Sequence, residues 1–194
     1  DIYRVGMQFL DFGTYARDQV SSFRLAKSKV DELAEETGER IWFVIEENGL
    51  AWFLYGSSGK HPVNPPLTEG SNAYLHRTAG GKAILAHLDQ DRIEQIIDRI
   101  GLPAATEHTI SNREDLLAEL SDTRDRGIAL NKEESLLGLH ALSAPIIHKE
   151  TREPLGSLSL SGPANRITES RIHDGLAELI RGAANEIEIN VSYE

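Results

Sequence analysis

Hydrophobic residues recur with a helical period in two long stretches of the chain. Between residues 16 and 37 they fall near one face, and Gly38 follows as a helix stop; they are Val20, Phe23, Val30 and Leu33. Residues 93–100 carry isoleucine at i, i+3, i+4 and i+7 before Gly101 and Pro103. These patterns predict two amphipathic helices, each ended by a glycine.

Capping residues predict three further helices. Thr78 can open a helix over 78–88, and Ser111 with Glu114 has the spacing of a capping box for a helix that ends near Gly127. Thr168 can open the closing helix. One apolar stripe follows it, formed by Ile172, Leu176, Leu179, Ile180, Ala183 and Ile187.

Strand-like segments alternate with these helices. Residues 41–46 and 50–55 are joined through Asn48-Gly49, a strong hairpin signal. Further strands are expected over 127–131, 138–147 and 155–161, with a turn at 148–154, while 56–73 is expected to be a long loop. Helices that flank a mostly antiparallel sheet make an α+β fold.

The segment LHRTAGGKAILA (75–86) opens its helix with two adjacent glycines, which cost roughly 1 kcal/mol each relative to alanine. With Thr78 as N-cap, the amides of 79–82 lack partners inside the helix, so this terminus can bind an anion. The glycines can instead let the helix pack closely on a neighbour. A phosphate-binding P-loop is excluded, because His76 stands at the required first glycine and Ala83 at the Ser/Thr position.

The segment LGSLSLSGP alternates leucine with Ser157, Ser159 and Ser161. Period two puts the serines on one face of a strand, where they either face water or line a polar cavity for a small ligand. In GIALNKEESLLGLHALSAPI (127–146), Asn131 ends one strand and the pair Glu133-Glu134 follows in a loop. A solvated pair is the expectation there, with acid–base work as the alternative. Leu139, Ala141 and Ser143 share one face of the next strand.

Composition narrows the function classes. The net charge is −11, from 31 acidic and 20 basic residues. Because an acidic surface repels phosphate backbones, this chain alone is not expected to bind nucleic acid. Many acidic residues with few lysines is a composition associated with a high-salt cytoplasm, although an ordinary acidic protein fits as well.

The absence of cysteine excludes disulfides and thiolate chemistry. The seven histidines lack HxxxH or HxH spacing, and nothing resembles a membrane span or a signal peptide, so a cytoplasmic protein without a cofactor is expected.

Four motifs, in this order along the chain, resemble the effector-binding domain of IclR-type transcription regulators. They are LAEETGERIWFVIEENGLAWFLY (33–55), LHRTAGGKAILA (75–86), GIALNKEESLLGLHALSAPI (127–146) and LGSLSLSGP (155–163). The opening YRVGMQFLDFG also looks like the segment that follows the winged helix-turn-helix of such regulators. Residues 1–15 are therefore expected to be a linker from that DNA-binding domain, and 16–194 the effector-binding domain.

The resemblance implies a GAF-like fold with a small-molecule pocket on one face of its sheet. Backbone groups at the helix opening and hydroxyls of the serine strand would hold the effector. Asn131 stands where some members have aspartate, Ala141 where many have cysteine, and Ala73 where a larger aliphatic residue is frequent. The implied effector-binding residues are Ala73, Thr78, Ala79, Gly80, Asn131, Leu139, Ala141, Ser159 and Ser161.

The leading hypothesis is a non-catalytic module that senses an organic acid or a sugar-derived metabolite and oligomerises as a dimer or a dimer of dimers. DNA would be bound only through the upstream domain. A small GAF-like enzyme is the alternative from another class, and a purely structural dimerisation domain is a third.

Overall fold

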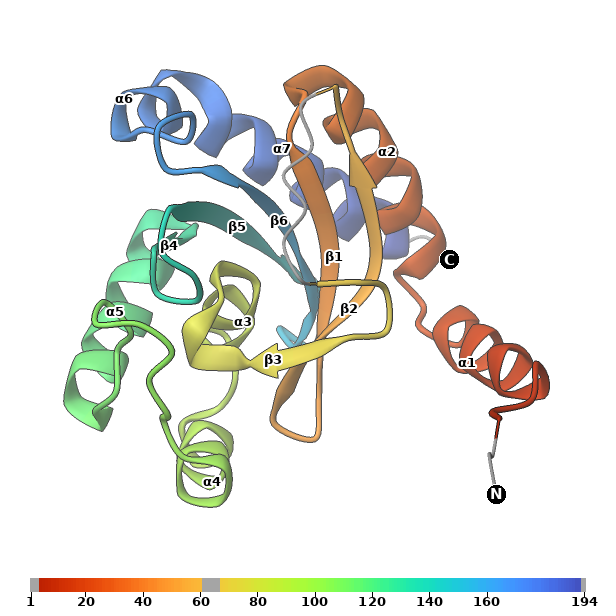
Figure 1. Cartoon of the computed structure of the whole chain (residues 1–194), viewed down its shortest axis with the longest axis horizontal. Coiled ribbons are helices and arrows are strands. Elements are labelled where there is room, and N and C mark those ends of the chain that lie inside the picture. Colours follow the sequence, from red (N-terminus) through yellow and green to blue (C-terminus); the bar gives the residue numbers. More distant parts are fainter. Residues whose placement is uncertain (1–3, 61–66, 193–194) are drawn as a thin grey trace.

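The computed structural model describes residues 4–60 and 67–192. Its centre is a six-stranded antiparallel sheet in the order β3-β2-β1-β6-β5-β4 (Figure 1). The strands are β1 (Arg40–Glu47), β2 (Leu50–Ser58), β3 (Asn72–Tyr74), β4 (Ala129–Lys132), β5 (Leu139–Ile147) and β6 (Pro154–Pro163). This arrangement confirms the α+β prediction.

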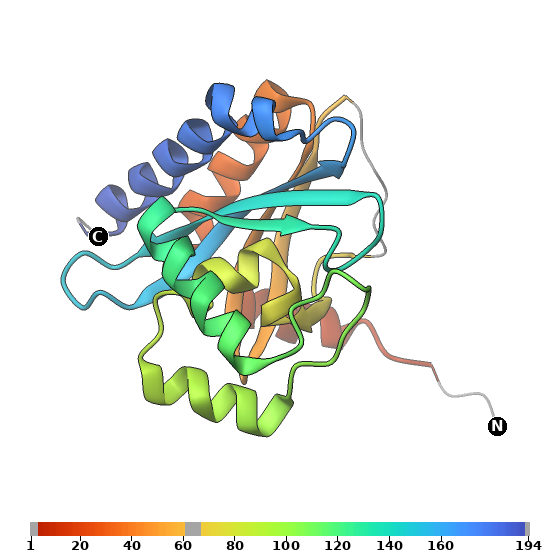
Figure 2. The same ribbon diagram turned by 90° about the vertical axis from the view of Figure 1, so that its left-hand side faces the viewer.

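Helices cover both faces of the sheet, as Figure 2 shows edge-on. One layer holds α2 (Phe23–Thr37) and α7 (Ala177–Val191), and the other holds α3 (Ala79–Leu85), α4 (Gln90–Ile100) and α5 (Arg113–Arg126). A 3₁₀ turn, η1 (Leu75–Arg77), leads into α3. Helix α1 (Gln8–Asp18) buries no residue and projects from the body at the N-terminal side (Figure 1).

Alternating residues of each strand supply two separate apolar cores. Ile41, Phe43, Leu158 and Leu160 pack against α2 and α7, whereas Trp42 and Val44 belong to the cluster with α3, α4 and α5. The serines at 157, 159 and 161 therefore face the α3 side of the sheet. The period-two pattern of the sequence is reproduced in space.

The hairpin at Asn48-Gly49 is confirmed. Both residues have positive φ, 55° and 82°, which a two-residue hairpin loop requires and which Asn and Gly adopt most easily. The pairing of Glu47 with Leu50 closes the turn.

Two helix predictions need correction. The helix expected over 16–37 is two helices, because α1 ends at Asp18 and α2 begins at Phe23. The serines at 21 and 22 separate them, and only α2 has a face to bury against the sheet. The expected linker 1–15 is likewise helical from Gln8 onward.

The predicted capping box at Ser111 is also wrong. Asn112 caps α5, because its Oδ1 accepts a hydrogen bond from the amide of Asp115 at 2.9 Å. Its Nδ2 donates to the Asp115 carboxylate, so both side chains close the helix start. The stop at Gly127 is confirmed, with φ of 69°.

The closing helix begins after Thr168 as predicted, but it is interrupted. A short turn, α6 (Glu169–Arg171), leads into a π-type segment, η2 (Ile172–Leu176), in which Gly175 has φ of 146°. Helix α7 follows. Part of the expected loop 56–73 is strand, since β2 runs to Ser58 and β3 starts at Asn72; its residues 61–66 lie outside the described residues.

Candidate functional site

The start of α3 has the predicted cap. Thr78 Oγ1 accepts a hydrogen bond from the Gly81 amide at 3.0 Å. The amides of Ala79 and Gly80 also belong to the first turn, and the helix has no earlier turn whose carbonyls could accept from them. Since Ser157 of β6 donates to the Gly80 carbonyl at 3.1 Å, this turn sits directly on the sheet.

The two glycines serve close packing. A Cβ on Gly81 would lie 2.2 Å from the carbonyl oxygen of Leu75, and one on Gly80 would meet Val44 and Ser157 at 3.1 and 3.2 Å. The space beside both glycines is thus filled by protein. These contacts favour the close-packing interpretation of both glycines, while anion binding by the helix terminus stays a prediction.

The serine faces of β5 and β6 divide into bonded and free hydroxyls. Ser143 donates to the Leu158 carbonyl at 2.7 Å, and Ser157 donates to Gly80. Ser159 and Ser161 are 5% and 7% exposed, and their hydroxyls have no hydrogen-bond partner among the described residues. Neither hydroxyl is used inside the described part of the protein, and their contact with an effector stays a prediction from the family resemblance.

Two donors from β1 lie beside the free hydroxyls, and sequence reasoning missed them as site residues. In the register of β1 and β6, Arg40 pairs with Ser161 and Trp42 with Ser159, so each pair points to the same face. Arg40 Nε and Trp42 Nε1 are buried without a partner in the described part of the chain. Period two along β1 could have placed both residues on the serine face.

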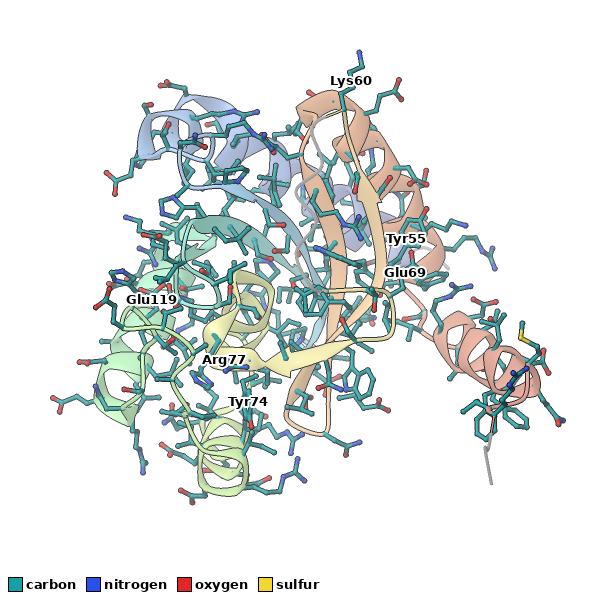
Figure 3. All side chains as sticks on the ribbon, in the orientation of Figure 1. Tyr55, Lys60, Glu69, Tyr74, Arg77 and Glu119 are labelled. Carbon is teal, nitrogen blue, oxygen red and sulfur yellow. The ribbon has the colours of Figure 1, made fainter. Side chains whose placement is uncertain are left out.

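Burial is the main influence on the Arg40 guanidinium. It lowers the pKa of Arg40 from its ordinary value, and the Glu69 carboxylate acts in the opposite direction. Figure 3 marks Glu69 beside β2. The guanidinium carbon of Arg40 lies 4.2 Å from the centre of the Trp42 ring, which fixes the two side chains as a stacked pair.

Asn131 lies in the same row of the sheet, which runs Asn131, Ala141, Ser161, Arg40. Its amide is already used: Nδ2 donates to the Arg77 carbonyl at 2.5 Å and Oδ1 accepts from the Glu134 amide at 3.1 Å. Asn131 therefore holds the chain just before α3. Asn131 thus has a positioning role, and its expected contact with the effector stays a prediction.

The remaining expected residues divide between two places. Leu139 and Ala141 are buried on the serine face and belong to neither apolar core, so they border the polar group. Ala73 lies on edge strand β3, three strands from β6, and lines a separate cavity of about 350 Å³ with Tyr74 and Arg77. The structure does not bring Ala73 to the serines.

A buried ion pair connects α3 to the loop after β4. Lys82 is 1% exposed, and its Nζ donates to both carboxylate oxygens of Glu134 at 2.8 and 2.7 Å. Burial raises the pKa of Glu134 above its ordinary value, while Lys82 opposes that effect. The expectation of a solvated Glu133-Glu134 pair is therefore wrong for Glu134, because folding brings Lys82 to it from 52 residues away.

His76, in the turn before α3, predicts a loss of stability in acid. Burial lowers its pKa from 6.5 to about 4, although a hydrogen bond to the Pro103 carbonyl opposes this. Between these values the unfolded chain binds the proton and the native state does not, so stability falls as the pH falls from about 6.5 towards 4.

We expect His76 to account for a loss of about 2 kcal/mol between pH 7.5 and pH 5, measured by urea unfolding at each pH. His76→Phe should flatten this dependence in part, with His87, whose pKa burial also lowers, supplying the rest. An unchanged slope in that variant would contradict the assignment.

Within residues 4–60 and 67–192, no group of three or more histidine, aspartate or glutamate side chains is placed to hold a metal ion. In the same described ranges, every helix is too short or too polar to cross a bilayer.

Comparisons with known proteins identify the family of the chain. The family model described as "Bacterial transcriptional regulator IclR C-terminal" matches residues 16–189. A probable transcriptional regulator, ArcR, of Halobacterium salinarum is 30% identical over 97% of this chain and 73% of its own length. The transcriptional repressor IclR of Escherichia coli is 32% identical over 83% of this chain and 58% of its own length.

A solved structure shares the fold. It is a double mutant of the PobR inducer-binding domain from Acinetobacter, in complex with 3-hydroxybenzoic acid, with a TM-score of 0.77 and 24% identity over 85% of this chain and 96% of that one. The match over residues 16–189 covers most of the sequence. This chain therefore belongs to the IclR family of bacterial transcriptional regulators, as the effector-binding C-terminal domain of that family.

Proposed function

We propose that this domain binds a small organic acid or a sugar-derived metabolite between α3 and the serine face of β6. The observation that carries the proposal is the pair of buried serines, Ser159 and Ser161, whose hydroxyls have no hydrogen-bond partner among the described residues. The amides of Ala79 and Gly80 in the first turn of α3 add donors. Thr78 caps that turn, and Leu139 and Ala141 supply its apolar border.

The proposed consequence is control of DNA binding. A ligand that favours one arrangement of a dimer, or of a dimer of dimers, shifts the population towards it. In this proposal, residues 1–15 link each effector-binding domain to a DNA-binding domain. The ligand would then change the spacing of two such DNA-binding domains on the operator. The ligand-bound PobR domain supports an organic acid as the class of effector.

A non-catalytic role fits the residues of this site better than an enzyme does. The chain has no cysteine, and neither free serine has a histidine or carboxylate hydrogen-bonded to it among the described residues. A serine without such a base is a poor nucleophile. The site is therefore assigned to binding.

A thermal-shift screen of organic acids and sugar acids tests the proposal. An effector at about 100 times its dissociation constant should stabilise the protein by about 2.7 kcal/mol. The double variant S159A/S161A should lose most of this ligand-induced shift, because in the proposed site the two removed hydroxyls form hydrogen bonds only with the ligand.

Ser143→Ala is the matched control. Its hydroxyl binds the Leu158 carbonyl, so the variant should lower the melting temperature without ligand and keep the ligand-induced shift. If S159A/S161A responds to the effector as the wild type does, the effector site lies elsewhere.

A further inference from the structure

One cation in the proposed site keeps a free donor. Arg40 is half-buried and its Nη1 donates to Ser58 Oγ at 2.5 Å, while its Nε stays without a partner in the described residues. The Glu69 carboxylate raises the pKa of Arg40 through its charge, but among the described residues it forms no ion pair with Arg40. It instead accepts a long hydrogen bond of 3.4 Å from the Gly56 amide. A buried guanidinium donor with no acceptor is costly, so an acceptor from a ligand would be stabilising.

Trp42 presents a second free donor at a fixed position. Its side chain is 1% exposed and its ring packs edge-on against Phe53 at 5.3 Å. A Cβ on Gly56 would lie 2.4 Å from the Trp42 ring, so β2 also closes on the indole. Because Arg40 stacks on the same ring, the indole cannot turn to bring Nε1 to water.

These donors and the serine hydroxyls form one group on two neighbouring rungs of the sheet. Arg40 stands opposite Ser161, and Trp42 opposite Ser159. A carboxylate has two oxygens that accept about four hydrogen bonds, which matches one charged donor, one neutral donor and two hydroxyls. A carboxamide of the same shape would turn one N–H towards donors that need an acceptor.

We propose that Arg40 and Trp42 bind the carboxylate of the effector directly and make the site select organic anions over neutral analogues. The inference rests on the proposed function and adds the residues that set the ligand's charge. It also fits the charge balance, since a protein of net charge −11 repels anions in general and needs a local cation to hold one.

The test uses carboxylate–carboxamide pairs and the two indole signals of the ¹⁵N-labelled chain. The probes are acetate against acetamide and benzoate against benzamide. The chain has two tryptophans, and Trp52 Nε1 already donates to the Glu47 carbonyl, so its signal is an internal reference. The carboxylates should shift the Trp42 indole signal and leave that of Trp52 in place, whereas the amides should shift neither.

Variants separate this inference from the proposed function. Arg40→Gln should weaken benzoate binding about tenfold or more, and Trp42→Phe, which keeps a ring, should weaken it several-fold. Arg24→Gln, at an exposed position of helix α2, is the matched control and should bind as the wild type does.

Three outcomes would overturn the inference: amides that bind as well as acids, no shift of Trp42 with any probe, or wild-type affinity in Arg40→Gln and Trp42→Phe. Where Ser159→Ala also loses binding in the last case, the effector site stands and only the role of Arg40 and Trp42 fails. Where none of these variants changes the affinity, the proposed function fails as well.

Discussion

Replacing Lys82 by methionine should destabilise the protein by about 3–5 kcal/mol, because it leaves the carboxylate of Glu134 buried without its counter-ion. Lys82 is 1% exposed and Glu134 is 7% exposed, so water cannot take over the lost hydrogen bonds. Glu119, 3.5 Å from the Lys82 ammonium, would lose this contact as well but keep its ion pair with Arg126 at 3.0 Å. Chemical unfolding at neutral pH measures the loss directly.

The double variant Lys82→Met/Glu134→Leu distinguishes a broken pair from a broken core. With both charges removed, most of the lost stability should return, since an apolar pair of similar volume often matches a buried ion pair. Lys132→Met is the matched control. Lys132 pairs with Glu169, which is largely exposed, so the variant should have the melting temperature of the wild type. A double variant as unstable as Lys82→Met would show that the lysine stem, and not the charge pair, carries the effect.

The same pair bears on the proposed site. Thr106 and Thr109 donate to the carbonyls of Glu133 and Glu134, so this loop is tied on one side to the chain after α4 and on the other to Lys82 of α3. Asn131 then holds the Arg77 carbonyl. Lys82→Met is therefore expected to loosen the start of α3 and to weaken effector binding without touching the ligand.

Features set by neighbouring residues could be predicted from the sequence. Thr78 caps α3, Asn48-Gly49 closes the hairpin, and alternation puts Ser159 and Ser161 on one face. Each depends on spacings of one to four residues, for which backbone geometry leaves little choice. The family's motifs in turn predicted the sheet with its flanking helices.

Features set by tertiary contacts could not be predicted. Nothing local in the sequence distinguishes Ser157, which bonds to Gly80, from Ser159, which has no partner among the described residues. Glu39 looks like any surface acid, yet it is 3% exposed and binds Arg166 at 2.7 Å from 127 residues away. Burial alone would raise the pKa of Glu39, and the hydrogen bonds from Arg166 and Arg171 lower it below its ordinary value.

The glycines at the start of α3 show how one local pattern leaves two interpretations open. Both a ligand pocket and close packing explain a helix that begins with two glycines, and the difference lies in what surrounds a missing Cβ. That surrounding is backbone for Gly81, at 2.2 Å from the Leu75 oxygen and 2.5 Å from its Cα. Leu75 is itself 2% exposed, so the turn cannot move aside freely.

Gly81→Ala should therefore destabilise the protein by about 3 kcal/mol, although alanine is the better helix former by roughly 1 kcal/mol. Gly80→Ala meets only side-chain atoms at 3.1 Å or more, so a cost of about 1 kcal/mol is expected. Gly182→Ala, in α7 with nothing within 4 Å, is the control and should stabilise by up to about 1 kcal/mol. Urea unfolding of the three variants ranks them, and a Gly81→Ala protein as stable as the wild type but unable to bind effector would restore the ligand interpretation of both glycines.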